Sequence, residues 1–188
     1  MAKPEFRLEL PGWVETYLGS YGDKFDSSES RMRLAVGLSR RNIEEGTGGP
    51  FGAAIFARDT GRLIATGVNM VTSLGCSIWH AEMAAIARAQ MRLRTYELGR
   101  DEPMELVSSC EPCAMCLGAV PWSGVSRLIC GARDEDARAA GFDEGAKPAD
   151  WIDELAQREI EVIRDVLRNE AAAVLADYAA GGGEIYNG

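Results

Sequence analysis

Two short segments decide the fold and the chemistry of this chain: His80-Ala81-Glu82 and Pro112-Cys113-Ala114-Met115-Cys116. The first holds the only histidine of the sequence, and the second holds two cysteines three positions apart. On a helix that spacing projects both thiols from one face. The proline suits the start of such a helix, where the helix N-terminus favours thiolates. One imidazole and two thiolates make a ligand set that suits zinc.

The ligand number indicates a catalytic site rather than a structural one. Three protein ligands leave the fourth tetrahedral position to water. Glu82 follows the histidine by two residues and is placed to act as acid and base for that water. The order His-x-Glu, then Pro-Cys-x-x-Cys, is the signature of zinc-dependent deaminases. A structural zinc knuckle with Cys110 as fourth ligand stays open as an alternative, whereas Cys76 and Cys130 are expected to be structural.

The composition is that of a globular domain with excess negative charge. Of 188 residues, 46% are hydrophobic and 26% charged, and the formal net charge is −9. Such a surface repels phosphate backbones, which argues against a nucleic-acid partner. No apolar run reaches the roughly 18 residues needed to cross a bilayer, and Met1–Leu10 is unlike a signal peptide. The five cysteines, an odd number, favour metal binding over a disulfide framework. We expect a cytoplasmic protein without a membrane partner.

The apolar pattern predicts a mixed sheet between helices, in one domain. Residues 1–26 are expected to be an irregular N-terminal extension, 27–180 the zinc-dependent deaminase domain, and 181–188 a C-terminal tail with a flexible joint at Gly181-Gly182-Gly183. The expected elements are a helix at 27–46, a hairpin of strands at 51–57 and 63–68, a helix at 80–94, a strand at 104–109, a helix at 113–119, strands at 125–130 and 160–166, and a final helix at 167–178.

At the two metal-binding segments the chain resembles the cytidine and deoxycytidylate deaminase superfamily, over roughly residues 27–133. The His-Ala-Glu and Pro-Cys-x-Met-Cys forms look like the branch that contains guanine deaminases and transfer-RNA adenosine deaminases. The resemblance implies an α/β fold, a three-layer α/β/α sandwich with a central mixed five-stranded sheet. It also implies one Zn²⁺ per chain. Further segments resemble guanine deaminases: Gly49-Pro50-Phe51-Gly52-Ala53-Ala54, Gly67-Val68-Asn69, Trp122-Ser123-Gly124-Val125, Gly141-Phe142-Asp143-Glu144-Gly145 and Ile185-Tyr186-Asn187-Gly188.

This resemblance assigns roles to the residues of those segments. Phe51 is expected to lie against the base, Asn69 to bond its edge, and Trp122 and Phe142 to contact it, while the backbone at Ala81 and Cys113 bonds the reacting centre. A second acid comes from Asp143 or Glu144, and the register favours Glu144. Tyr186 is expected to close the active site, often that of the partner in a homodimer with an exchanged C-terminal segment. Plain packing, turn capping or surface exposure stay open as alternatives for these side chains.

The predicted reaction is hydrolytic deamination of a small-molecule heterocyclic base, with guanine converted to xanthine and ammonia. Glu82 would carry the proton of the attacking water to the ring, and Glu144 would help the amine to leave. The alternatives are a guanine-like amino-triazine, guanosine or cytosine as substrate. A transfer-RNA adenosine deaminase and a non-catalytic, zinc-stabilised binding module rank below these.

Overall fold

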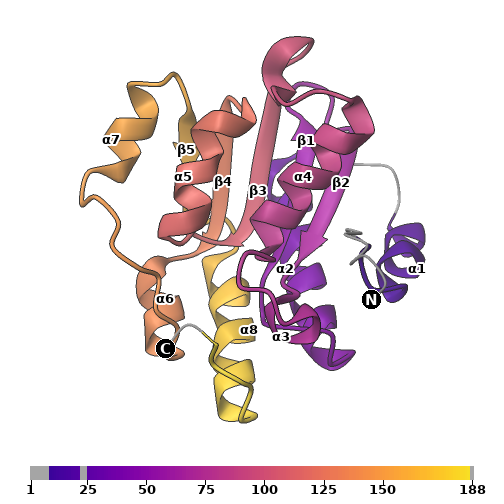
Figure 1. The fold of residues 1–188 in the computed structure, drawn as a ribbon, viewed down its shortest axis with the longest axis vertical. Coiled ribbons are helices and arrows are strands. Elements are labelled where there is room, and N and C mark those ends of the chain that lie inside the picture. The colour runs from indigo at the N-terminus through magenta and orange to yellow at the C-terminus, as the bar shows by residue number, and fades with distance from the viewer. Residues whose placement is uncertain (1–8, 22–24, 187–188) are drawn as a thin grey trace, which may run out of the picture.

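Five strands form one mixed sheet through the centre of the molecule (Figure 1), in the order β2-β1-β3-β4-β5. This computed structural model describes residues 9–21 and 25–186. β1 runs antiparallel to both of its neighbours, whereas β3, β4 and β5 run parallel to one another. The predicted mixed five-stranded sheet is confirmed. The strands are β1 (Gly52–Ala57), β2 (Leu63–Val68), β3 (Met104–Cys110), β4 (Arg127–Ala132) and β5 (Glu161–Ile163).

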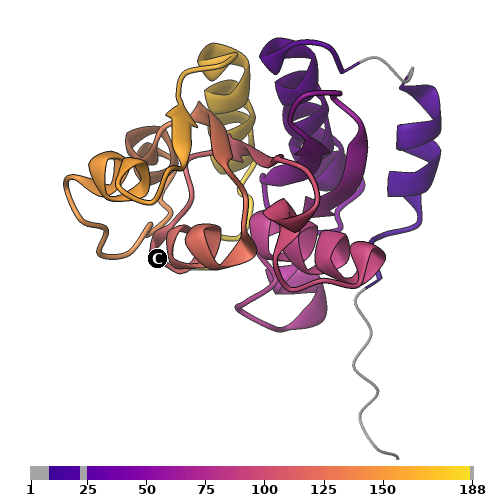
Figure 2. The ribbon, with the colours of Figure 1, turned by 90° about the horizontal axis from the view of Figure 1, so that it is seen from above.

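Helices cover both faces of this sheet and complete the three predicted layers (Figure 2). α2 (Ser28–Glu44) and α8 (Arg168–Ala180) pack on one face, and α4 (Ala81–Leu93) and α5 (Ala114–Ser123) on the other. Neighbouring strand residues point to opposite faces. Phe56 therefore belongs to the core under α2, and Ile55 to the core under α4.

The start of α2 shows how the sequence sets a boundary. The Ser27 hydroxyl accepts a hydrogen bond from the Ser30 amide, and the Ser30 hydroxyl accepts one from the Ser27 amide, both at 3.1 Å. This reciprocal cap satisfies two amides that no helical carbonyl can reach. Near the first turn of the helix, Arg31 forms an ion pair with the fully buried Glu105 of β3. Arg127 Nη1 lies 3.2 Å from the second oxygen of that carboxylate.

Several short elements were not predicted: α1 (Trp13–Ser20), α3 (Val71–Leu74), a 3₁₀ turn η1 (Leu98–Arg100), α6 (Asp134–Ala139) and α7 (Trp151–Ala156). The prediction of an irregular extension was wrong for α1. Pro11 lies just before the N-cap residue Gly12, and its carbonyl accepts the Val14 amide at 3.0 Å, so the helix begins directly after these two residues. Val14 is buried against the domain. The expected extension residues 1–8 and 22–24, and Asn187 and Gly188 of the tail, lie outside the described residues.

The topology brings two helix starts to one edge of the sheet. α4 follows the hairpin of β1 and β2, and α5 follows β3 directly. Their first residues come immediately after His80 and Cys113, so the two predicted metal-binding segments meet there. Among the described residues, no helix has the length and apolar character that crossing a membrane requires.

Candidate metal centre and active-site pocket

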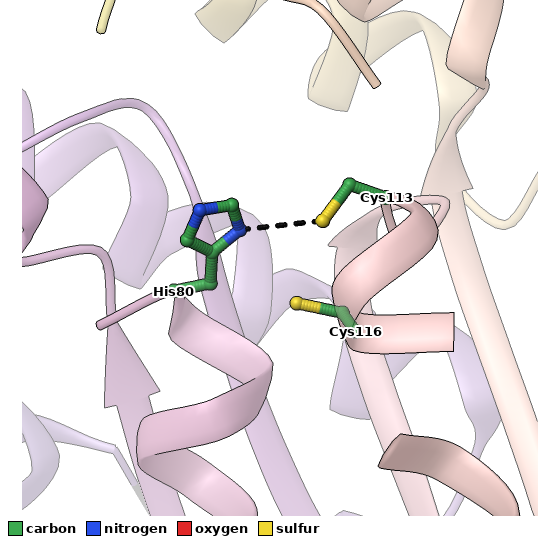
Figure 3. Close-up of side chains that lie close together, drawn as sticks. All are labelled: His80, Cys113 and Cys116. Atoms are coloured by element: carbon green, nitrogen blue, oxygen red, sulfur yellow. Dashed lines mark hydrogen bonds between the residues drawn. The ribbon is translucent and has the colours of Figure 1, made fainter. Parts of the chain in front are cut away.

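The three predicted metal ligands converge between the starts of α4 and α5 (Figure 3). His80 is the N-cap residue of α4, and Cys113 is the N-cap residue of α5. The ligand atoms of His80, Cys113 and Cys116 all lie within 4.8 Å of one another, and Cys113 Sγ is 3.5 Å from His80 Nδ1. This is the one such cluster in the described part of the chain. The geometry of the predicted ligand set is therefore in place.

The chemistry of these donors fits zinc. The pKa of the Cys113 thiol is lowered to about 4, because the Cys116 thiol donates a hydrogen bond to it and His80 lies beside it. A thiolate is the form that binds a metal. Cys110 does not join the cluster, since its buried thiol lies 3.6 Å from the Arg133 carbonyl. With an imidazole and two cysteine sulfurs to offer, the site matches a catalytic zinc centre rather than a closed four-ligand knuckle, and Cys116 would give up its proton on binding the metal.

Glu82 lies in the first turn of α4, next to the ligands. Ser108 of β3 donates a hydrogen bond to Glu82 Oε1 at 3.2 Å, and Glu82 Oε2 lies 3.5 Å from Cys116 Sγ. Burial raises the pKa of this carboxyl, and the nearby Cys113 thiolate raises it further. One oxygen of Glu82 is thus held in place, and the other faces the metal centre.

A small pocket opens beside the ligands and brings together most of the predicted site residues. It is lined by Phe51, His80, Glu82, Glu111, Cys113, Phe142, Glu144 and Tyr186. The Phe142 ring packs against Phe51, with centroids 5.0 Å apart, and against Tyr186, with centroids 5.3 Å apart. The cavity that remains is about 10 Å³, roughly the room of one water molecule. With Tyr186 in this position a heterocyclic base does not fit.

The structure distinguishes the two candidate acids of the 141–145 segment. Glu144 is buried in the pocket wall, and its carbonyl accepts a hydrogen bond from the Ala114 amide of α5 at 2.9 Å. Burial raises the pKa of Glu144 to about 8, and the charge of Cys113 adds to the shift. The side chain of Asp143 is 62% exposed and lies 3.3 Å from Arg138 Nη1. Asp143 lines a second, open hollow of about 300 Å³, which His80, Cys113 and Glu144 also line, and it does not line the smaller pocket.

Asn69, at the end of β2, has one buried polar atom without a partner. Its side chain is 1% exposed, and its Oδ1 accepts a hydrogen bond from the Val71 amide at 3.1 Å. Asn69 Nδ2 has no hydrogen-bond partner among the described residues, and the same is true of the Tyr186 hydroxyl in the pocket. An unpaired buried donor costs about 1–3 kcal/mol. A ligand that offers an acceptor would recover this energy.

Besides Asp143, three predicted contact residues do not line the pocket, namely Asn69, Trp122 and Ala81. Trp122 lies on α5 and is 85% exposed, so its contact with a base remains a prediction. Ala81 is buried as the first residue of α4, and no side chain of the preceding residue caps that helix start. The role of its backbone also remains a prediction.

Two further residues at the site were not predicted. Glu111 lines the pocket, but its oxygens accept hydrogen bonds from Arg164 Nε at 2.5 Å and the Asp134 amide at 3.1 Å. In the sequence, only its position directly before Pro112 could have indicated that Glu111 lies at the site. Lys147 Nζ donates to the Pro112 carbonyl at 3.1 Å and pairs with Asp134 at 2.5 Å. These contacts fasten the segment that follows Glu144 to the residue before the first metal-binding cysteine.

Comparisons with known proteins agree with this site. The family described as cytidine and deoxycytidylate deaminase zinc-binding region matches residues 26–132. A guanine deaminase of Bacillus subtilis (strain 168) is 41% identical over 116 residues, which are 62% of this chain and 71% of that protein.

Two solved structures extend the similarity to nearly the whole chain. The guanine deaminase from Nitrosomonas europaea has a TM-score of 0.88 and 43% identity, over 94% of this chain and 97% of that chain. NE0047 in complex with 2,6-diaminopurine has a TM-score of 0.89 and 44% identity, over 96% of both chains. With its His-x-Glu and Pro-Cys-x-x-Cys ligands assembled at two helix starts, the chain belongs to the cytidine and deoxycytidylate deaminase family of zinc-binding hydrolases.

Proposed function

We propose that this protein is a guanine deaminase, which converts guanine and water to xanthine and ammonia. The observation that carries the proposal is the pairing of two buried glutamates, Glu82 and Glu144, around the ligand cluster in one aromatic pocket. Deamination needs a base for the attacking water and an acid for the leaving amine, and this pair supplies both. The choice of guanine is supported by the relatives of that name at 41% and 43% identity.

Recognition of the base uses the aromatic wall and the unpaired amide. Phe51 and Phe142 offer apolar ring faces for a planar heterocycle. Asn69 Nδ2 is free to donate to an acceptor on the edge of guanine, because Oδ1 is already held by Val71. A ring that lacks the acceptor leaves this buried donor unpaired when it binds. The site therefore discriminates strongly against such rings.

The catalytic step follows from the placement of Glu82. When bound by His80, Cys113 and Cys116, one zinc ion per chain supplies the activation of water at neutral pH. Glu82 Oε2 takes a proton from the attacking water, since Oε1 is anchored by Ser108. It passes this proton to a ring nitrogen of guanine as the C–O bond forms at C2.

Glu144 acts on the leaving group in this proposal. Its buried carboxyl holds a proton near neutral pH and donates it to the exocyclic nitrogen as the C–N bond breaks. Ammonia departs, the new C2 hydroxyl loses its proton as the carbonyl of xanthine forms, and a proton returns to Glu144. Asp143 is committed to Arg138 and does not share this role.

The tail 181–188 serves as the closing segment of the pocket. Tyr186 occupies the space that the base needs, so it must move before binding and can cover the base afterwards. A closed pocket excludes solvent and strengthens the electrostatic interactions inside it. Deletion of residues 184–188 should reduce turnover and leave the zinc content and melting temperature nearly unchanged.

We further propose a cytoplasmic homodimer. Three large apolar side chains are exposed, Ile78 before α4 and Met115 and Trp122 on α5, and exposed apolar residues of this kind are typical of interfaces. If the tails are exchanged, mixing tail-deleted chains with Glu82→Gln chains should restore activity. Unrestored activity in a confirmed mixed dimer would place each tail on its own chain, as it lies in this structure.

The experiment that tests the proposal is ammonia release from a panel of bases: guanine, guanosine, adenine, cytosine, an amino-triazine and transfer RNA. We expect the highest kcat/KM with guanine, and xanthine as its product. If kcat/KM is higher with the triazine, cytosine or transfer RNA than with guanine, that compound is the substrate and the choice of guanine is wrong.

A further inference from the structure

A chain of side-chain hydrogen bonds connects the N-terminal helix α1 to the pocket. Trp13 Nε1 of α1 donates to Thr47 Oγ1 at 2.9 Å, and Thr47 Oγ1 donates to Asn42 Oδ1 at 2.7 Å. Asn42 Nδ2 then donates to the carbonyls of Gly49 and Asn69, both at 2.8 Å. The chain therefore reaches both segments that flank the predicted base site.

The donors and acceptors of this relay fix its direction. An indole nitrogen only donates, so the Thr47 hydroxyl accepts from Trp13 and has its single proton left for Asn42. Asn42 must then present its oxygen to Thr47 and its two amide protons to the two carbonyls. A flipped amide would set its oxygen against both carbonyls. Trp13 and Thr47 thus lock the orientation of a side chain that is fully buried.

The two carbonyls lie in segments that cannot shift independently. The Asn69 amide donates to the Phe51 carbonyl at 3.1 Å, so the end of β2 and the aromatic wall move together. A Cβ atom at Gly48 would lie 1.9 Å from the Asn69 carbonyl oxygen, and one at Gly49 would lie 2.2 Å from the Tyr186 hydroxyl. Asn42 sits at the centre of this tight packing. It holds the backbone of Asn69, and therefore the position of Asn69 Nδ2.

We propose that Trp13, Thr47 and Asn42 are positioning residues for substrate recognition. Through them, α1 sets the place of Asn69 and of the 48–51 segment. None of the three lines the pocket, and each acts through its neighbour in the relay. Residues 9–21 then contribute to substrate binding, although they do not contact the substrate. The inference rests on the proposed function in one respect, the use of Asn69 Nδ2 to bond the base.

Two conservative variants break the relay with little change in volume. Trp13→Phe removes the indole donor, and Thr47→Val replaces the hydroxyl with a methyl group. Each should raise KM for guanine about fivefold, the equivalent of about 1 kcal/mol for one hydrogen bond, and change kcat less than twofold. The double variant should have nearly the same KM as either single variant, because both break the same chain. Tyr17→Phe is the matched control, since it removes from α1 a hydroxyl that donates to the Tyr21 hydroxyl, outside the relay.

Coupling to Asn69 separates positioning from general damage. In an Asn69→Ala background, Thr47→Val should raise KM less than it does in the parent, because the Asn69 side chain is gone and only the 48–51 segment is left for the relay to position. A purely structural role predicts the same loss in both backgrounds, together with a lower melting temperature that follows the loss of activity. Equal losses in the two backgrounds, or an unchanged KM in both single variants, would overturn the proposal.

Hydrogen exchange gives a readout that needs no substrate. Peptides covering residues 48–52 and 67–72 should exchange their amides faster in Thr47→Val than in the parent, and a peptide from α8 should not. Unchanged exchange at both segments would also overturn the relay. A wrong proposed function would give a different result from a wrong relay, because the unaltered parent protein would then release no ammonia from guanine. KM would then be measured with the base that the parent deaminates most efficiently, and the exchange result stands regardless.

Discussion

Replacement of Asn69 by Ala separates a binding role from a structural one, because the two sides of the amide have different partners. The change removes the Oδ1 acceptor of the Val71 amide and, with it, the unpaired Nδ2 donor. Loss of the first costs about 1–3 kcal/mol, and removal of a buried unpaired donor returns a similar amount. The free energy of unfolding should therefore change by only about 1 kcal/mol, or roughly 2–4 °C in melting temperature for a chain of this size.

Guanine binding should respond much more strongly than stability. With Asn69→Ala, an acceptor of the bound base loses its partner in a desolvated pocket, at a cost of about 1–3 kcal/mol. That range corresponds to a rise in KM of roughly 5- to 150-fold. The turnover number kcat should change less, since the bond is made at the base edge in both the ground state and the transition state.

The assay is steady-state ammonia release from guanine together with thermal unfolding of the same preparations. Asn69→Asp sharpens it, because the acid keeps an acceptor for Val71 but offers no donor to the base, so its KM should rise at least as much. Ser27→Ala is the contrasting control. It breaks the cap of α2, which should cost about 1 kcal/mol of stability and leave KM unchanged. A large fall in melting temperature for Asn69→Ala with KM within twofold of the parent would refute the reasoning and leave Asn69 as a turn cap.

Three further variants test other parts of the molecule. Glu82→Gln should keep zinc and fold while kcat falls about 10²–10⁴-fold, measured by ammonia release and elemental analysis, and turnover within a few-fold of the parent would exclude its proton transfer. Glu144→Gln should lower kcat more than it raises KM, whereas the control Asp143→Asn should change both very little. A larger loss of kcat in Asp143→Asn than in Glu144→Gln would make Asp143 the second acid. Glu105→Gln leaves the buried Arg31 without its ion-pair partner, so denaturant unfolding should show a loss of about 3 kcal/mol or more, and a loss below 1 kcal/mol would contradict this.

The sequence predicted the layers, the sheet and the metal cluster because those features depend on local spacing. The i, i+3 cysteines and the single histidine needed only the starts of α4 and α5 to meet, which the strand order ensures. The prediction missed α1, because the helix has only eight residues and directly follows Pro11 and Gly12, two residue types that are typical of loops.

Other features depend on contacts between residues far apart in the chain and could not be predicted from spacing. Glu111 is held by Arg164, and Lys147 reaches back to Pro112. The relay from Trp13 to Asn69 crosses four separate segments, and no periodicity in the sequence marks it. The buried, unpaired amide of Asn69 is likewise a property of the packed structure alone.

The most direct test of the central claim is guanine turnover by the purified protein before and after removal of its metal. We expect one zinc per chain by elemental analysis and stoichiometric formation of xanthine and ammonia from guanine. Chelation should abolish this activity, and added zinc should restore it, because His80, Cys113 and Cys116 remain available to bind the metal. Guanine turnover that persists in the metal-free protein, or a zinc-loaded protein that releases no ammonia from guanine, would contradict the account.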